Sequence, residues 1–125
     1  MRRLFIESSI FSRELKGLIN DNKITDAEYK QFQEKLLYNP KAGTVMPGLS
    51  GLRKVRMGYH GKGTSGGLRV DYLDIPEAEC LHLLVIYSKN VKDDLTPEEK
   101  KEIRELVKIL KKEAVSRVQT IKRKS

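Results

Sequence analysis

Residues 68–87 read LRVDYLDIPEAECLHLLVIY, and this stretch decides the fold of the 125-residue chain. Apolar and polar side chains alternate over residues 68–73, which is typical of a strand with one buried face. Residues 81–87 are almost continuously apolar, as expected of a strand that lies inside its sheet and is covered on both faces. Residues 74–79 contain Pro76 and are predicted to form the turn between the two strands. The stretch therefore predicts an antiparallel pair of strands.

A third predicted strand precedes this pair. Residues 52–57 (LRKVRM) also alternate, and residues 58–67, which include five glycines, are predicted to form a flexible hairpin loop. Three consecutive strands with such connections should form an antiparallel meander. A short apolar run at residues 4–6 predicts a further strand near the N-terminus.

Three helices are predicted from apolar residues that recur at three- and four-residue steps. The first spans about residues 8–20. The second follows Thr25, which has the spacing of a capping box with Glu28, and it ends at Asn39 because a proline comes next. The third spans about residues 97–117 and starts with a proline after a capping threonine.

These elements predict one α+β domain over residues 1–117, in the order strand, helix, helix, three strands, helix. Residues 41–50 show no helical spacing and are predicted to be a connecting loop. The basic tail at residues 118–125 is predicted to fray. We expect the helices to pack on one face of the meander, and we expect the opposite face to be concave and basic.

Basic charge gathers in the middle of the chain. Residues 41–70 contain none of the 17 acidic residues, but they carry six lysines and arginines. Such a segment cannot neutralise its own charge, and a net charge of +8 favours an anionic partner such as nucleic acid. Lys54 and Arg56 lie two residues apart and should project from one side of their strand, within reach of Arg69 on the next strand. Arg53 should point to the opposite face.

Several kinds of site have no support in the sequence. Cys80 is the only cysteine, so the chain can form neither an intramolecular disulfide nor a thiolate zinc site. His60 and His82 are isolated from each other, and His82, in an apolar strand, is predicted to be a core histidine with satisfied hydrogen bonds. We therefore expect no metal and no other cofactor. The absence of a long apolar run predicts a cytoplasmic protein without membrane contact.

Three motifs together resemble the HigB branch of the RelE-type toxins. They are GLRKVR at residues 51–56, GKGTSGGLRV at residues 61–70, and LLVIYSKN at residues 83–90 followed by DDLT at residues 93–96. The matching order of elements extends the resemblance over nearly the whole chain, and only residues 117–125 are not covered. It implies a microbial-RNase-like fold and a toxin of a type II toxin–antitoxin system, which cleaves messenger RNA in the ribosomal A site.

The implied reaction uses the 2′-hydroxyl of RNA as the nucleophile on the adjacent phosphorus. It needs a base, stabilisation of charge on the phosphate, and an acid for the leaving oxygen. The resemblance matches Lys54 to the base candidate and Arg56 to a phosphate binder, and it places Arg69 at the scissile phosphate. A lysine crowded by other cations can serve as a base, because its charged form is disfavoured.

The general acid stays open. Lys89 matches the basic motif that leaves the last strand, but the founding branch of the family has an arginine where this chain has Asn90. It also has a later tyrosine that this chain lacks, so Lys89 and Tyr87 are the remaining candidates. Further RNA contacts are expected from Arg53, Tyr59, His60, Lys62 and Tyr87.

The resemblance also implies partners: messenger RNA, the ribosome, and an antitoxin that is commonly a helix-turn-helix protein. Operator DNA would be reached only through the antitoxin complex. Two alternatives stay open, since lysines and arginines are ordinarily solvated surface charges. One is a non-catalytic module that binds RNA or DNA, and the other is a degenerate toxin that acts only through antitoxin binding.

Overall fold

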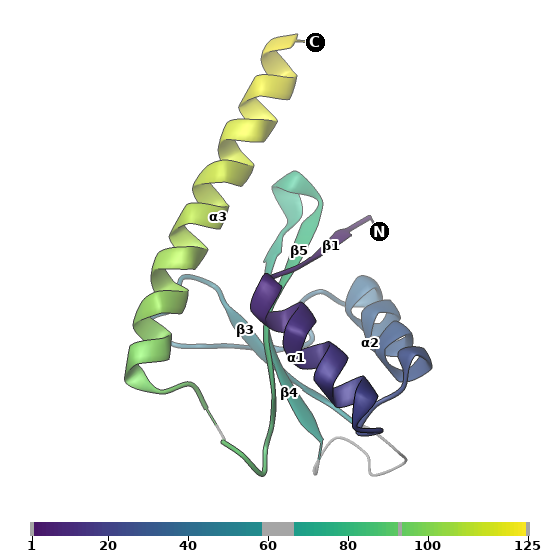
Figure 1. Cartoon of the computed structure of the whole chain (residues 1–125). Coiled ribbons are helices and arrows are strands. Elements are labelled where there is room, and N and C mark those ends of the chain that lie inside the picture. Colours follow the sequence, from purple (N-terminus) through teal and green to yellow (C-terminus); the bar gives the residue numbers. More distant parts are fainter. Residues whose placement is uncertain (1, 59–66, 93, 125) are drawn as a thin grey trace.

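The computed structural model describes residues 2–58, 67–92 and 94–124, which form a five-stranded sheet with three helices (Figure 1). The elements are, in chain order, β1 (Leu4–Glu7), α1 (Ser9–Asn20), α2 (Asp26–Tyr38), β2 (Thr44–Val45), β3 (Arg53–Met57), β4 (Leu68–Ile75), the 3₁₀ turn η1 (Pro76–Ala78), β5 (Cys80–Ser88) and α3 (Pro97–Lys124). The predicted order is confirmed, with one addition. The short strand β2 lies in a segment that was predicted to be a loop.

The strands lie side by side in the order β1-β5-β4-β3-β2. Strands β3, β4 and β5 form the predicted antiparallel meander, and β5 lies inside the sheet, as its apolar sequence predicts. Strand β1 joins β5 in parallel, with Leu4 opposite Cys80, so the sheet is mixed. At the other edge, β2 pairs with only the first two residues of β3, Arg53 and Lys54. Among the described strands, the rest of β3 therefore forms an edge.

Capping hydrogen bonds fix the helix starts where the sequence predicts them. Helix α2 begins at the predicted capping box. At α3, the Thr96 hydroxyl accepts from the Glu99 N–H at 3.2 Å, and the Glu99 carboxylate accepts from the Thr96 N–H at 2.8 Å. Helix α3 runs to Lys124, beyond the predicted end near residue 117. In the described part of the chain, no helix is both long and apolar enough to span a bilayer.

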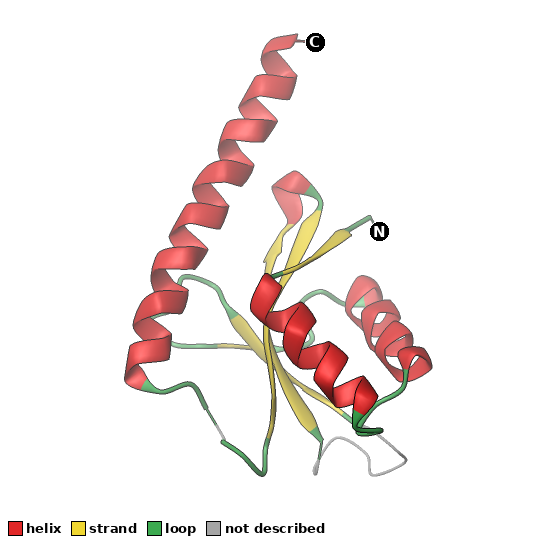
Figure 2. Ribbon diagram, viewed as in Figure 1, coloured by secondary structure: helices red, strands yellow, loops and turns green. Residues whose placement is uncertain are grey.

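The helices cover both faces of the sheet, which corrects the prediction that they pack on one. Helices α1 and α2 bury Phe11 and Phe32 in a core on one face. Helix α3 buries Val107 and Ala114 in a separate core on the other face, together with Leu73 of β4. Figure 2 shows α3 standing apart from the other two helices.

The reason for this arrangement lies in β4. Its side chains are apolar on both faces, because Val70 and Tyr72 belong to the core under α1 and α2, whereas Leu73 and Ile75 belong to the core under α3. Apolar surface is stabilised by being removed from water, so the second face needs a helix of its own. The basic surface is thus only the part of the second face that α3 leaves open.

Candidate nucleic-acid interface

Two arginines lie directly opposite each other on the open part of the second face. Arg56 of β3 is the cross-strand partner of Arg69 in β4. Lys54 projects from the same face, because Val55 and Met57 point into the core on the other side. Like charges in directly opposed positions repel each other, so an anion placed between them is stabilised. The two-residue spacing in the sequence predicted this shared face.

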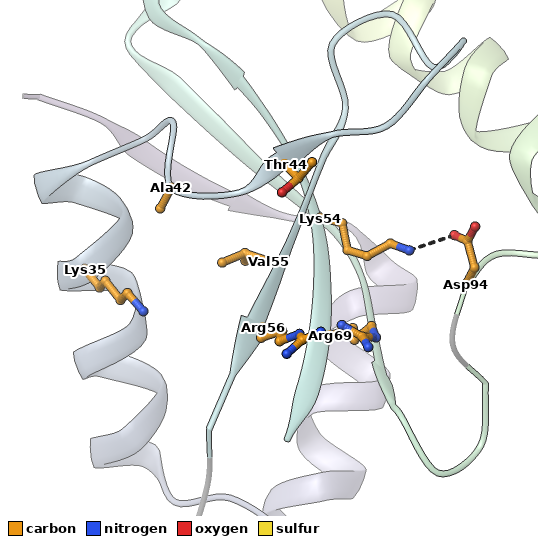
Figure 3. A pocket seen from close by; sticks show the side chains of 8 residues that line it. All are labelled: Lys35, Ala42, Thr44, Lys54, Val55, Arg56, Arg69 and Asp94. Carbon is orange, nitrogen blue, oxygen red and sulfur yellow. Dashed lines mark hydrogen bonds and ion pairs between the residues drawn. The ribbon is translucent and has the colours of Figure 1, made fainter. Parts of the chain in front are cut away.

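These cations line an open pocket of about 660 Å³ (Figure 3). A fourth cation, Lys35 of α2, reaches the pocket from beyond the edge of β3. Only Arg69 is deeply placed, with 8% of its surface exposed, whereas Arg56 is exposed. The complete set of described lining residues is Lys35, Ala42, Thr44, Lys54, Val55, Arg56, Arg69 and Asp94. The pocket can therefore hold a phosphate group against cations from three elements.

Sequence reasoning missed Lys35. It lies in the last turn of α2, where a basic side chain is ordinarily explained by its favourable interaction with the helix dipole. Its approach to Arg56 depends on how α2 packs against β3, which residue spacing does not reveal.

Asp94, which precedes α3, ties the pocket to that helix. Its carboxylate accepts from the Lys54 ammonium at 3.1 Å and from the Lys100 ammonium at 3.0 Å. Burial acts to raise the pKa of Asp94, but the hydrogen bonds from Lys100 and Lys54 outweigh it and lower this pKa to about 2. Asp94 is therefore ionised at neutral pH and competes with an incoming phosphate for Lys54. It belongs to the DDLT motif, but the motif did not assign it a role.

Asp71 of β4 is the cross-strand partner of Lys54, one of the cations that line the pocket. Asp71 is fully buried, and its Oδ1 accepts a hydrogen bond from the Tyr87 hydroxyl at 3.4 Å. Burial raises the pKa of Asp71 to about 7, while the charge of Lys54 and the bond from Tyr87 oppose that rise. Sequence reasoning passed over Asp71 as an ordinary polar residue in an alternating strand.

Tyr87 is a predicted site residue that the structure places mostly inside the protein. Only 7% of its surface is exposed, and the Lys92 ammonium lies 5.1 Å from the centre of its ring. Burial, followed by the charge of Asp71, raises the pKa of the Tyr87 hydroxyl. Its hydroxyl therefore stays protonated near neutral pH.

Arg53 points away from the pocket, as the alternation predicts. Its guanidinium donates to the Gly43 carbonyl at 2.7 Å. The Tyr72 hydroxyl holds the same segment, because it donates to the Pro40 carbonyl at 2.7 Å and accepts from the Gly43 N–H at 2.9 Å. A Cβ atom on Gly43 would lie 2.9 Å from the Lys54 carbonyl oxygen, so this close approach requires glycine. These contacts position the pocket wall that contains Ala42.

Lys89, another predicted site residue, is not brought to the pocket. Lys89 is exposed just beyond β5, and it is absent from the described residues that line the pocket. Tyr59, His60 and Lys62 lie outside the described residues. Their predicted RNA contacts stay predictions.

His82 is buried on the second face of the sheet, as predicted for a core histidine. The prediction of satisfied hydrogen bonds was wrong, because its Nε2 has no partner among the described residues. Burial lowers the pKa of His82, helped by the charge of Arg117 and opposed by Glu113, both on α3. The histidine is therefore neutral at physiological pH.

The protein-family models include none that matches this chain. The resemblance to RelE-type toxins consequently depends on the quoted motifs and on the order of elements. In the described ranges, no three His, Cys, Asp or Glu side chains come together as a possible metal site.

Proposed function

We propose that this protein is a ribosome-dependent messenger RNA endonuclease, the toxin of a type II toxin–antitoxin system. The observation that carries the proposal is the direct opposition of Arg56 and Arg69 in an open pocket that also contains Lys54 and Lys35. A single phosphate with its oxygens turned toward two guanidinium groups would relieve their repulsion. A backbone phosphate of RNA carries the charge and the geometry for this site.

In the proposed reaction, the 2′-hydroxyl attacks the adjacent phosphorus and the bond to the 5′-oxygen breaks, which leaves a cyclic phosphate and a free 5′-hydroxyl. Arg56 and Arg69 stabilise the charge that grows on the phosphate oxygens. Lys54 could receive the 2′-hydroxyl proton only as a neutral amine, released from Asp94 and with its own proton lost to water. Lys89 and Tyr87 remain alternatives for the group that protonates the leaving oxygen.

The ribosome, the message in its A site and a helix-turn-helix antitoxin enter the proposal through the resemblance. So do the microbial-RNase-like fold and a cytoplasmic location. The electrostatic part is independent of the resemblance, because a chain of net charge +8 whose cations gather in a pocket attracts any polyanion.

A non-catalytic RNA- or DNA-binding module is the second candidate. It is favoured by one observation, the ion pair that holds the Lys54 ammonium on Asp94 at 3.1 Å. A lysine held in this way contributes charge to binding but is not placed to take a proton. A degenerate toxin that only binds its antitoxin would share this arrangement.

Primer extension on a defined message, in a reconstituted translation reaction with and without ribosomes, separates these functions. We expect cuts only with translating ribosomes, and a loss of roughly 100-fold or more in cleavage when Arg69→Ala removes charge stabilisation. Arg56→Ala is the matched variant at an exposed position, and Lys112→Ala on the exposed surface of α3 is the control.

The same variants are tested for RNA binding as a function of salt. Loss of one phosphate contact should lower the salt slope by about one and weaken binding far less than cleavage. Intact messages in every lane, with RNA binding that still weakens in both arginine variants, would refute the endonuclease and support the binding module.

A further inference from the structure

A buried acid lies beside the cations of the basic pocket. Asp71 has no exposed surface, and it lies directly across from Lys54 in the sheet. The Lys54 ammonium nevertheless bonds to Asp94, a residue of the loop before α3. Within the described chain, Oδ2 of Asp71 has no hydrogen-bond partner at all. Asp71 is therefore not explained as one half of an ion pair.

The described groups around Asp71 come from several neighbouring elements. Three cations on β3, β4 and the loop after β5 outnumber one carboxylate, and a tyrosine hydroxyl supplies a hydrogen bond. They are Lys54, Arg69, Lys92, Asp94 and Tyr87. Burial disfavours the Asp71 carboxylate while the cations favour it, so a change in local charge shifts the balance between its two protonation states.

We propose that Asp71 takes up a proton when a phosphate-bearing ligand enters the pocket, and that this uptake sets how tightly the pocket binds the ligand. That the ligand is RNA rests on the proposed function. The proton uptake itself concerns any polyanion that reaches Arg56 and Arg69.

Two effects favour the protonation of Asp71 when such a ligand binds. A phosphate group at the arginines adds negative charge near Asp71, which disfavours its carboxylate and favours the neutral acid. An unpaired, ionised oxygen in a buried site is also far more costly than a neutral hydroxyl there, so Oδ2 can carry the proton. Because burial already raises the pKa of Asp71 to about 7, both forms are populated near neutral pH.

Binding that takes up a proton strengthens as the pH falls. If the ligand raises the pKa of Asp71 from about 7 to roughly 8, affinity should be about seven-fold higher near pH 6 than near pH 8.5. Asp71 is buried and does not touch the ligand. It would change the affinity indirectly, through its charge beside the cations that bind the phosphate.

The test uses the full chain and a fluorescent single-stranded DNA oligonucleotide, which lacks the 2′-hydroxyl and cannot be cut by the proposed reaction. Its dissociation constant is measured by anisotropy from about pH 6 to pH 8.5 at fixed ionic strength. His60→Gln is introduced throughout, because an imidazole also titrates in this range. Asp71→Asn should remove the pH dependence.

Glu105→Gln is the matched control. Glu105 is an exposed carboxylate on α3 that pairs with Lys108, and it is not among the described residues that line the pocket, so its replacement should leave the affinity and its pH dependence unchanged. Equal pH dependence with and without Asp71→Asn would overturn the proposal, as would flat binding by the His60→Gln chain itself.

A second measurement covers the case in which Asp71→Asn does not fold. Calorimetric titration of the His60→Gln chain near pH 7.5, in two buffers of different ionisation enthalpy, reports the protons taken up on binding. Uptake of a substantial fraction of one proton supports the proposal, and zero uptake refutes it. Both assays omit ribosomes, so proton-linked binding by a chain that never cuts messages would refute only the endonuclease.

Discussion

Replacing Tyr72 by Phe should destabilise the protein by several kilocalories per mole, because one hydroxyl satisfies two backbone groups. It donates to the Pro40 carbonyl at 2.7 Å and accepts from the Gly43 N–H at 2.9 Å. Tyr72 is fully buried, and both backbone residues are buried as well. Phe keeps the packing of the ring and removes only the hydroxyl.

A buried backbone group that loses its partner costs about 1–3 kcal/mol, so the two groups together should cost roughly 2–6 kcal/mol. The measurement is the midpoint of urea unfolding, with the slope checked to be unchanged. Tyr29→Phe is the control, since the Tyr29 hydroxyl bonds to Glu7 near the surface and its loss should cost less than about 1 kcal/mol.

Equal losses of stability in Tyr72→Phe and Tyr29→Phe would refute this role of the Tyr72 hydroxyl. The hydroxyl also matters for function, because the contacts with Pro40 and Gly43 hold the pocket wall beside Ala42. Variants of Tyr72 that still fold should therefore bind RNA more weakly than variants of Tyr29 with the same stability.

Two further substitutions test the fold around the site. Gly67→Ala would place a Cβ atom 2.2 Å from the Met57 carbonyl oxygen, so we expect thermal unfolding to show a loss of stability above roughly 3 kcal/mol. Gly17→Ala is the control, because its Cβ atom would meet nothing within 4 Å on an exposed helix face. This substitution should be neutral or stabilise the protein by up to about 1 kcal/mol. The lowered pKa of Asp94 makes its ionised form a source of stability above about pH 4 that is lost as the pH falls through about 2. Urea midpoints should show Asp94→Asn weaker than the unmodified chain at pH 6 but not at pH 2, and an equal difference at both values would contradict the assignment.

Local patterns predicted most of the secondary structure, because the interactions behind them span only a few residues. The capping boxes before α2 and α3 are examples, and so are the three strands of the meander. Strand β2 was missed because two residues, Thr44 and Val45, are too few for an alternating pattern. The position of α3 was missed for a different reason. Strand β4 has apolar residues on both faces, and this was not recognised as a sign that each face packs against a helix.

The candidate site divides in the same way. Lys54, Arg56 and Arg69 share a face because of strand periodicity, which residue spacing reveals. Lys35 and Asp94 reach the pocket through the packing of a helix and a loop, and those contacts join residues far apart in sequence. No local pattern carries that information.

The parallel pairing of β1 with β5 has a consequence for how the chain assembles. Strands β3, β4 and β5 can find one another as neighbours in sequence, but Leu4 must reach Cys80 from the far end of the domain. Such a non-local pairing is slow, since its loop must close before any contact rewards it. A molecule delayed at this step would already possess its basic pocket but would present the bare apolar edge of β5 as a template for another strand. Aggregation of newly made chains should therefore begin at the exposed edge of β5. The pairing of β1 with β5 covers this edge and protects against aggregation.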